Sequence, residues 1–222
     1  MRGISGSTRL SGVIGAPIRH SLSPAIFNAA FAAADLDWAY LAFEVAPDET
    51  ASALDAMRAL DFGGLSVTMP HKDAVARLVD RCSDDASALH AVNCVVPTDD
   101  GLVGENTDGP GFIDAVRTEV GLKVNGCRAV VFGAGGAARA IVLALARAGA
   151  RDVAVVNRTS SRAHGAATLG GSVGRVADVG AVVGADLVVN ATSVGMTGDL
   201  TPFDPELLEP GQIVVDAVYH PS

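Results

Sequence analysis

The chain has 222 residues, of which 49% are hydrophobic and 18% are charged, and its formal net charge at pH 7 is −9. This length fits one large domain or two small ones, and the apolar content is enough to form packed cores. The acidic balance and the dispersed basic residues argue against a nucleic-acid partner, and no apolar run has the length of a membrane span.

The N-terminus and the cysteines bear on the cellular compartment. Residues 1–8 are mostly small and polar, without the apolar core of a signal peptide, so we expect a frayed tail. Cys82, Cys94 and Cys127 are scattered and lack metal-ligand spacing. We therefore expect reduced thiols in a cytoplasmic protein, and no bound metal ion.

The first half of the chain mixes strands and helices. Apolar runs and helical spacing predict strands at 13–15, 38–45 and 64–69, and helices at 23–34, 48–60 and 71–81. At the start of the first helix we expect Ser23 as the N-cap and Pro24 as the first helical residue. Strands at 91–96 and 102–105 flank a typical hairpin turn at 98–101, and a helix is expected at 107–120.

The pattern of the second half is more regular. Strands are predicted at 128–132, 153–157, 187–191 and 213–218, with helices between them, and this alternation is typical of a doubly wound sheet. We place the domain boundary at the turn-rich link 121–126. The prediction is an α/β protein with an N-terminal α/β domain (1–121) and a C-terminal doubly wound, Rossmann-like domain (122–222), with a cleft between them for ligands.

A glycine-rich turn follows the first strand of the second domain. It consists of Gly133, Ala134, Gly135, Gly136 and Ala137, and it leads into a predicted helix. A strand, a tight glycine turn and a helix set backbone N–H groups and the helix N-terminus against a pyrophosphate. The glycines alone fit an ordinary turn equally well, because alanine stands where the third glycine of the usual pattern would be.

The residues after the next strand indicate which dinucleotide is bound. NAD-binding proteins usually present Asp or Glu at this position to the ribose 2′-OH. Here the strand ends in Asn157, Arg158 and Thr159, and Arg162 follows one helical turn later. Two guanidinium groups suit a 2′-phosphate, so the sequence favours NADP(H) over NAD(H).

A lysine and an aspartate could carry proton chemistry. Lys72 comes shortly after the predicted strand 64–69, and Asp108 follows the second hairpin strand. A nicotinamide enzyme that reduces a ketone needs a proton donor at the oxygen, and a lysine beside a carboxylate can serve. Taken singly, each residue also fits a purely structural role: Lys72 as a surface lysine and Asp108 as a helix-capping aspartate.

A second set of polar residues is uncharged and suited to hydrogen bonding with a neutral polyol. These residues stand at predicted strand or helix ends: Ser21, Ser23, Thr68, Asn93 and Asn106. Capping and turn formation account for several of them, but not for the occurrence of all five in one half of the chain.

Together these residues resemble the motifs of the shikimate dehydrogenase family. The motifs lie in the family's order at 15–24, 66–72, 91–93, 106–108, 133–137, 157–159, 190–196 and 216–219. The resemblance runs from about Val13 to the last residue. It implies reversible NADPH-dependent reduction of 3-dehydroshikimate to shikimate, on the route to chorismate and the aromatic amino acids.

The resemblance also implies a role for each matching position. Lys72 and Asp108 would form the catalytic pair, and Ser21 and Ser23 would hold the substrate carboxylate. The other substrate residues would be Thr68, Asn93, Asn106 and Tyr219, the last closing on the substrate. The cofactor would be bound by Gly133, Ala134, Gly135, Gly136, Ala137, Asn157, Arg158, Thr159, Arg162, Thr192 and Met196.

The chain departs from the family pattern in three places. Phe27 stands where the family often has His, and Ser66 stands where it often has Asn. The sequence ends without the segment that usually packs back on the first domain and supplies a substrate-binding Gln, so we expect lower stability and weaker substrate affinity. A quinate/shikimate dehydrogenase and a non-catalytic shikimate-binding homologue stay open as alternatives, as does the choice between monomer and homodimer.

Overall fold

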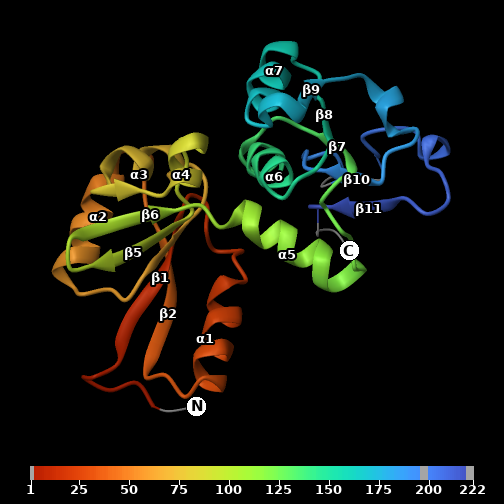
Figure 1. Cartoon of the computed structure of the whole chain (residues 1–222). Helices are drawn as coiled ribbons and strands as arrows, with labels where there is room; N and C mark the ends of the chain where they lie inside the picture. The colour runs from red at the N-terminus through yellow and green to blue at the C-terminus, as the bar shows by residue number, and fades with distance from the viewer. Residues whose placement is uncertain (1–2, 196–199, 219–222) are drawn as a thin grey trace. The chain divides into compact units, whose positions relative to one another are not determined.

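The computed structural model describes residues 3–195 and 200–218, which form two compact units, Met1–Thr107 and Asp108–Ser222 (Figure 1). The division falls at the start of α5 (Asp108–Val120), whereas the domain boundary predicted from the sequence lay after this helix. The packing explains the difference. Val116 is buried in the core of unit 2, and a side chain at Gly109 would overlap the carbonyl oxygen of Ala140.

Unit 1 contains a six-stranded mixed sheet in the order β2-β1-β3-β5-β6-β4. Its strands are β1 (Arg9–Gly15), β2 (Trp38–Glu44), β3 (Leu65–Val67), β4 (Arg81–Cys82), β5 (Cys94–Thr98) and β6 (Gly101–Glu105). Its helices are α1 (Ser23–Ala33), α2 (Thr50–Ala59), α3 (Lys72–Leu78) and α4 (Asp84–Leu89). β5 runs antiparallel to both β3 and β6, which confirms the predicted hairpin.

The start of unit 1 differs from the expected frayed tail. The first strand begins at Arg9 rather than at residue 13, because it pairs with β2 along its whole length. Just before it, the hydroxyl groups of Ser7 and Thr8 donate to the carboxylate of Asp37 at 2.9 and 2.8 Å. These bonds anchor the last residues of the expected tail.

Two further expectations for unit 1 were wrong. Ser23 is not the N-cap of α1, because Leu22 holds that position and the Ser23 N–H instead donates to the Ser21 hydroxyl at 3.2 Å. The predicted helix 71–81 ends at Leu78, since Val79 adopts an extended conformation that leads into β4. α4 was not predicted, although Ser83 caps it by accepting the N–H of Ala86.

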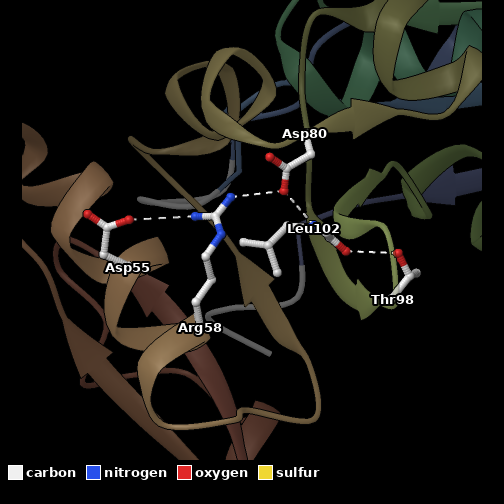
Figure 2. Close-up of polar contacts among 6 residues, drawn as sticks. Asp55, Arg58, Asp80, Thr98 and Leu102 are labelled. Atoms are coloured by element: carbon white, nitrogen blue, oxygen red, sulfur yellow. Dashed lines mark hydrogen bonds and ion pairs between the residues drawn. The ribbon is translucent and has the colours of Figure 1, made fainter.

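The turn between β5 and β6 is held by a carboxylate from the segment after α3. Asp80 Oδ2 accepts the backbone N–H of Leu102 at 2.6 Å and the guanidinium group of Arg58 at 3.0 Å (Figure 2). Arg58 also pairs with Asp55 at 3.6 Å. The bond from Leu102, and next that from Arg58, holds the pKa of Asp80 below its ordinary value. This network fixes the hairpin whose second strand leads to the candidate site.

Unit 2 is a doubly wound α/β domain, as predicted. Its sheet has the order β11-β10-β7-β8-β9, and all its pairings are parallel. The strands are β7 (Arg128–Phe132), β8 (Asp152–Val156), β9 (Gly174–Val176), β10 (Leu187–Asn190) and β11 (Ile213–Asp216), with helices α6 (Gly136–Arg147) and α7 (Ser160–Thr168). The strand order reverses between β7 and β10, so their carboxyl ends form the switch point where such sheets bind ligands.

The core of unit 2 explains why its central strands could be predicted from the sequence. The central strands are buried on both faces and consist largely of valine, with Val131, Val153 and Val189 fully buried. On one face, seven of the twelve residues of α6 are buried. On the other face, Phe203 stacks on Phe132 with ring centroids 4.8 Å apart. Among the residues that the structure describes, no helix is long and apolar enough to cross a membrane.

Candidate active site

The glycine turn after β7 has a backbone that only glycine suits at its first position. Gly133 has φ +111°, and a Cβ there would lie 2.7 Å from the carbonyl oxygen of Ala191. Its N–H donates to the carbonyl of Val156 at 2.9 Å, and the N–H of Ala191 donates to Phe132 at 2.9 Å. The turn is therefore clamped between the ends of β8 and β10.

The next two glycines leave the start of α6 open. No heavy atom lies within 4 Å of a Cβ built on Gly135 or Gly136. Gly135 is the N-cap of α6, without a side-chain cap, and the first turn contains no acidic residue. The unpaired N–H groups and the helix dipole at such an end favour an anion. The residues present thus fit the pyrophosphate of a dinucleotide.

An open pocket of about 500 Å³, here called the nucleotide pocket, lies over this turn. It lies wholly within unit 2, at the switch point. Its described lining residues are Phe132, Gly133, Ala134, Gly135, Val156, Asn157, Arg158, Arg162, Ala191, Thr192, Ser193, Val194 and Pro202. The structure therefore brings together seven of the residues predicted to bind the cofactor.

The other predicted cofactor residues lie elsewhere. Gly136 lines a neighbouring hollow, and Ala137 is exposed on α6. Thr159 is the N-cap of α7, and its carbonyl accepts the side-chain N–H of Asn157 at 3.0 Å. Met196 lies outside the described residues, as does the predicted substrate residue Tyr219.

The end of the nucleotide pocket beside β8 is cationic. Arg158 and Arg162 are both exposed, and within 3–195 and 200–218 neither makes an ion pair. No carboxylate occurs among the described lining residues. A ribose 2′-phosphate would find two guanidinium groups here, whereas a free 2′-OH would lack the usual acidic partner. The residues present therefore fit NADP(H).

One wall of the nucleotide pocket depends on a buried amide that was not predicted as a site residue. Asn190 is 3% exposed. Its Oδ1 accepts the N–H and the hydroxyl of Thr192 at 3.1 and 2.7 Å, and its Nδ2 donates to the carbonyl of Val194 at 3.1 Å. Nδ2 also donates to Asp216 at 3.0 Å. Asn190 thus ties the pocket loop after β10 to the end of β11.

In unit 1, backbone and amide bonds gather the predicted polar residues at neighbouring strand ends. The N–H of Val92 donates to the carbonyl of Lys72 at 2.9 Å, and the Asn106 side chain donates to the carbonyl of Ala91 at 3.0 Å. Asn93 Oδ1 accepts the N–H of Thr107 at 2.9 Å. Lys72, Asn93 and Asn106 therefore share one edge of the sheet. Asp108 follows Thr107 directly, as the first residue of α5.

The serine pair reaches the same edge from β1. The N–H of Ala16, just after β1, donates to the carbonyl of Met69 at 3.0 Å, and a side chain at Gly15 would overlap Thr68. The Ser21 N–H donates to the carbonyl of Ile18 at 2.9 Å, in the turn that follows. The ends of β1 and β3 therefore lie side by side, with Thr68 against Gly15 and Ser21 in the turn that follows β1.

His71, next to Lys72, has a structural explanation. Its ring is 1% exposed. Nε2 donates to the carbonyl of Val45 at 3.0 Å, because a carbonyl can only accept, and Nδ1 lies 2.8 Å from the Thr50 hydroxyl. The imidazole thus joins the start of α3 to the end of β2 and to α2, which fixes the backbone that carries Lys72.

The two side chains that depart from the family pattern contact the same tyrosine. Tyr40 stacks on Phe27 with ring centroids 4.4 Å apart and planes at 3°. Its hydroxyl donates to Ser66 Oγ at 2.6 Å, and burial raises the pKa of Tyr40. Phe27 and Ser66 therefore belong to one packing arrangement beneath the strand that leads to Thr68.

The doubly wound unit with its switch-point pocket, together with the polar strand ends of unit 1, defines a two-unit α/β protein of the dinucleotide-binding class. Sequence models of known families match both units. The model described as "Shikimate dehydrogenase substrate binding domain" matches residues 13–95, and that described as "Shikimate / quinate 5-dehydrogenase" matches residues 115–196.

Individual relatives agree with these matches. The shikimate dehydrogenase (NADP(+)) of Rubrobacter xylanophilus is 48% identical over 228 residues, covering 99% of this chain and 80% of the relative. The Listeria monocytogenes shikimate 5-dehydrogenase in complex with shikimate and NAD has a TM-score of 0.92 at 35% identity, covering 100% of this chain and 82% of that one. The Thermus thermophilus enzyme in complex with NADP(H) and shikimate has a TM-score of 0.88 at 36% identity, covering 96% and 80%. The chain belongs to the shikimate dehydrogenase family, which confirms the resemblance seen in its motifs.

Proposed function

We propose that this protein is an NADP-dependent shikimate dehydrogenase, an oxidoreductase acting on a CH–OH group. It would reversibly reduce 3-dehydroshikimate to shikimate, on the route to chorismate and the aromatic amino acids. The observation that carries the proposal is the gathering of Lys72, Asn93 and Asn106 at one sheet edge. The same chain also has the nucleotide pocket, which contains two arginines and no carboxylate among its described lining residues.

The cofactor NADP(H) would be held by unit 2. The turn Gly133, Ala134, Gly135, Gly136 and Ala137 would face the pyrophosphate through backbone N–H groups. Asn157, Arg158, Thr159 and Arg162 would hold the 2′-phosphate, and Thr192 and Met196 would lie on the nicotinamide side. When bound, NADPH supplies the hydride that reduces the ketone carbon.

Proton transfer would be the task of Lys72 and Asp108. Reduction of a ketone to a hydroxyl consumes one hydride and one proton, and the Lys72 ammonium group can deliver that proton to the carbonyl oxygen. In the reverse direction the neutral amine takes the hydroxyl proton. Asp108 would orient Lys72 and balance its charge. The chain places Asp108 directly after Thr107, whose N–H is bonded to Asn93 on the same edge as Lys72.

Substrate recognition would use the uncharged polar residues of unit 1. Ser21 and Ser23 would bind the carboxylate. Ser21 already accepts the Ser23 N–H, which leaves its own O–H to donate to an anion. Thr68, Asn93 and Asn106 would bind ring hydroxyls, and Tyr219, outside the described residues, would close on the substrate. Residues 1–107 would then supply Lys72 and the substrate-binding residues other than Tyr219, while unit 2 would supply Asp108 and bind the cofactor.

A spectrophotometric assay tests this function. Purified protein is mixed with shikimate and NADP⁺, and nicotinamide reduction is followed beside parallel reactions with NAD⁺ and with quinate. Fast reduction with shikimate and NADP⁺ alone supports the proposal, whereas comparable turnover of quinate would reassign the chain as a quinate/shikimate dehydrogenase. Lys72→Ala should abolish turnover with little change in NADP⁺ affinity. A wild-type protein that binds NADP⁺ and shikimate without turnover would be a non-catalytic homologue.

The thiols support a reducing compartment. Cys82, Cys94 and Cys127 are all free, and burial raises the pKa of each thiol, so the reactive thiolate is disfavoured at neutral pH. We propose a cytoplasmic location on this basis. Light scattering of the purified protein would decide between monomer and homodimer.

A further inference from the structure

A second hollow lies beside the nucleotide pocket, on its α7 side. Its volume is about 430 Å³, and we call it the arginine hollow. Its described lining residues are Ala134, Gly135, Gly136, Arg139, Arg162, Gly165 and Ala166. It shares Ala134, Gly135 and Arg162 with the nucleotide pocket, so the two spaces meet at the glycine turn.

Arg139 is the charged residue in this hollow that the cofactor motifs do not explain. It lies in the first turn of α6, where its N–H donates to the carbonyl of Gly135 at 3.0 Å, and it is half-buried. In the described part of the chain Arg139 makes no ion pair, and no carboxylate lines the hollow. Arg139 and Arg162 therefore line one space without a counter-charge, an arrangement that repulsion disfavours unless an anion lies between them.

We propose that Arg139 is a third cationic contact for the 2′-phosphate of NADP(H) and contributes to the preference for NADP over NAD. This inference rests on the proposed cofactor. A 2′-phosphate monoester carries a charge of about −1.5 to −2 at pH 7. A bidentate guanidinium contact from each side suits such a group better than one arginine alone.

The arginine hollow lies between the glycine turn and α7, the helix that carries the predicted 2′-phosphate residue Arg162. Gly165 and Ala166 belong to α7, which follows the tip of β8 and carries Arg162. The loop 191–194, which would lie on the nicotinamide side, lines the nucleotide pocket and contributes nothing to the described lining of the hollow. Gly165 leaves room for an anion, since no heavy atom lies within 4 Å of a Cβ built there.

Calorimetric titration of the full chain with NADP⁺, NAD⁺ and 2′,5′-ADP tests the proposal. Arg139→Gln should weaken NADP⁺ and 2′,5′-ADP binding by about tenfold, the usual scale for a charge-assisted hydrogen bond, and NAD⁺ binding by less than about twofold. Arg139→Lys, which keeps the charge, should fall between Arg139→Gln and the wild type. The matched control is Arg147→Gln, which removes the same charge from an exposed position about 12 Å along α6.

The change in the ratio of NADP⁺ affinity to NAD⁺ affinity decides whether Arg139 contacts the 2′-phosphate. An equal loss for NADP⁺ and NAD⁺ would overturn the proposal, because it would place Arg139 at the shared pyrophosphate or in the fold itself. Unchanged NADP⁺ affinity would overturn it as well. Shikimate turnover is measured separately on the wild type. A protein that binds NADP⁺ through Arg139 but is inactive would refute the dehydrogenase assignment and leave the role of Arg139 intact.

Discussion

Two glycines of the same turn should respond to alanine in opposite ways. Gly133→Ala places a Cβ 2.7 Å from the carbonyl oxygen and 3.0 Å from the carbonyl carbon of Ala191, at φ +111°. An L-residue in such a conformation costs about 1–2 kcal/mol. Overlap with a backbone that cannot yield freely adds about 1–3 kcal/mol. We expect the free energy of unfolding to fall by about 2–5 kcal/mol, by addition of these two costs.

Gly135→Ala is the matched control. Gly135 has φ −82° and ψ −172°, an extended conformation open to any residue, and no heavy atom lies within 4 Å of its Cβ position. The free energy of unfolding of the Gly135→Ala variant should equal that of the wild type or exceed it by up to about 1 kcal/mol, because alanine restricts the unfolded chain. The new methyl group, however, blocks the close approach of the pyrophosphate to the turn. NADP⁺ affinity should therefore fall by at least about tenfold, as for a lost charge-assisted bond.

Urea denaturation and NADP⁺ titration of both variants separate the two effects. The unfolding midpoint and slope give the free energy of unfolding, and the slope shows whether the unfolded state has changed. Wild-type stability in Gly133→Ala would refute the clamp between β8 and β10. Equal destabilisation of both variants would refute the distinction between a buried glycine and an open one.

Three other substitutions test separate parts of the structure. The pKa of Asp80 is lowered by its bonds to Leu102 and Arg58, so its stabilisation is complete above the ordinary value of 3.8 and disappears as the pH falls through the lower folded value. Asp80→Asn should lower the urea midpoint at pH 7 and flatten its acid dependence, and parallel pH curves would contradict this. Gly165→Ala, inside α7 with open space around its Cβ, should raise the free energy of unfolding by about 0.5–1 kcal/mol and Tm by about 1–4 °C, whereas a lower Tm would disprove the reasoning. Asn190→Asp sets an acceptor against the Val194 carbonyl and the Asp216 carboxylate, and should cost about 3 kcal/mol in thermal unfolding at neutral pH; a loss below about 1 kcal/mol would show that the amide network matters little.

The regular elements of unit 2 could be predicted because buried parallel strands have a strong local signal. β7, β8 and β10 are continuous apolar runs rich in valine, and each was placed to within a residue or two. β4 and β9 were missed. They have two and three residues at the edges of their sheets, too short for any periodicity to show.

Some residues of the candidate site could likewise be predicted from the sequence, and others could not. Arg158 and Arg162 were predicted from their distance to a strand end, and the structure places both in the nucleotide pocket. Arg139 was not predicted, because an arginine in the first turn of a helix resembles any solvated residue until α7 is packed against it. Ser23 was assigned to capping from a local pattern, but the neighbouring Ser21 accepts its N–H instead. Lys72 and Asp108 stay predictions, to be tested by substitution.

The amide of Asn190 has a consequence for how the nucleotide pocket can open. Its bonds to Thr192, Val194 and Asp216 share one side chain, and Asp216 in turn accepts the N–H of Val218 at 2.8 Å. None of these bonds can break without loosening the rest, so the loop after β10 and the end of β11 form one cooperative unit of local unfolding. In hydrogen exchange, we expect the amide protons of this unit to share a single opening event, so that this wall of the pocket is either wholly formed or wholly lost.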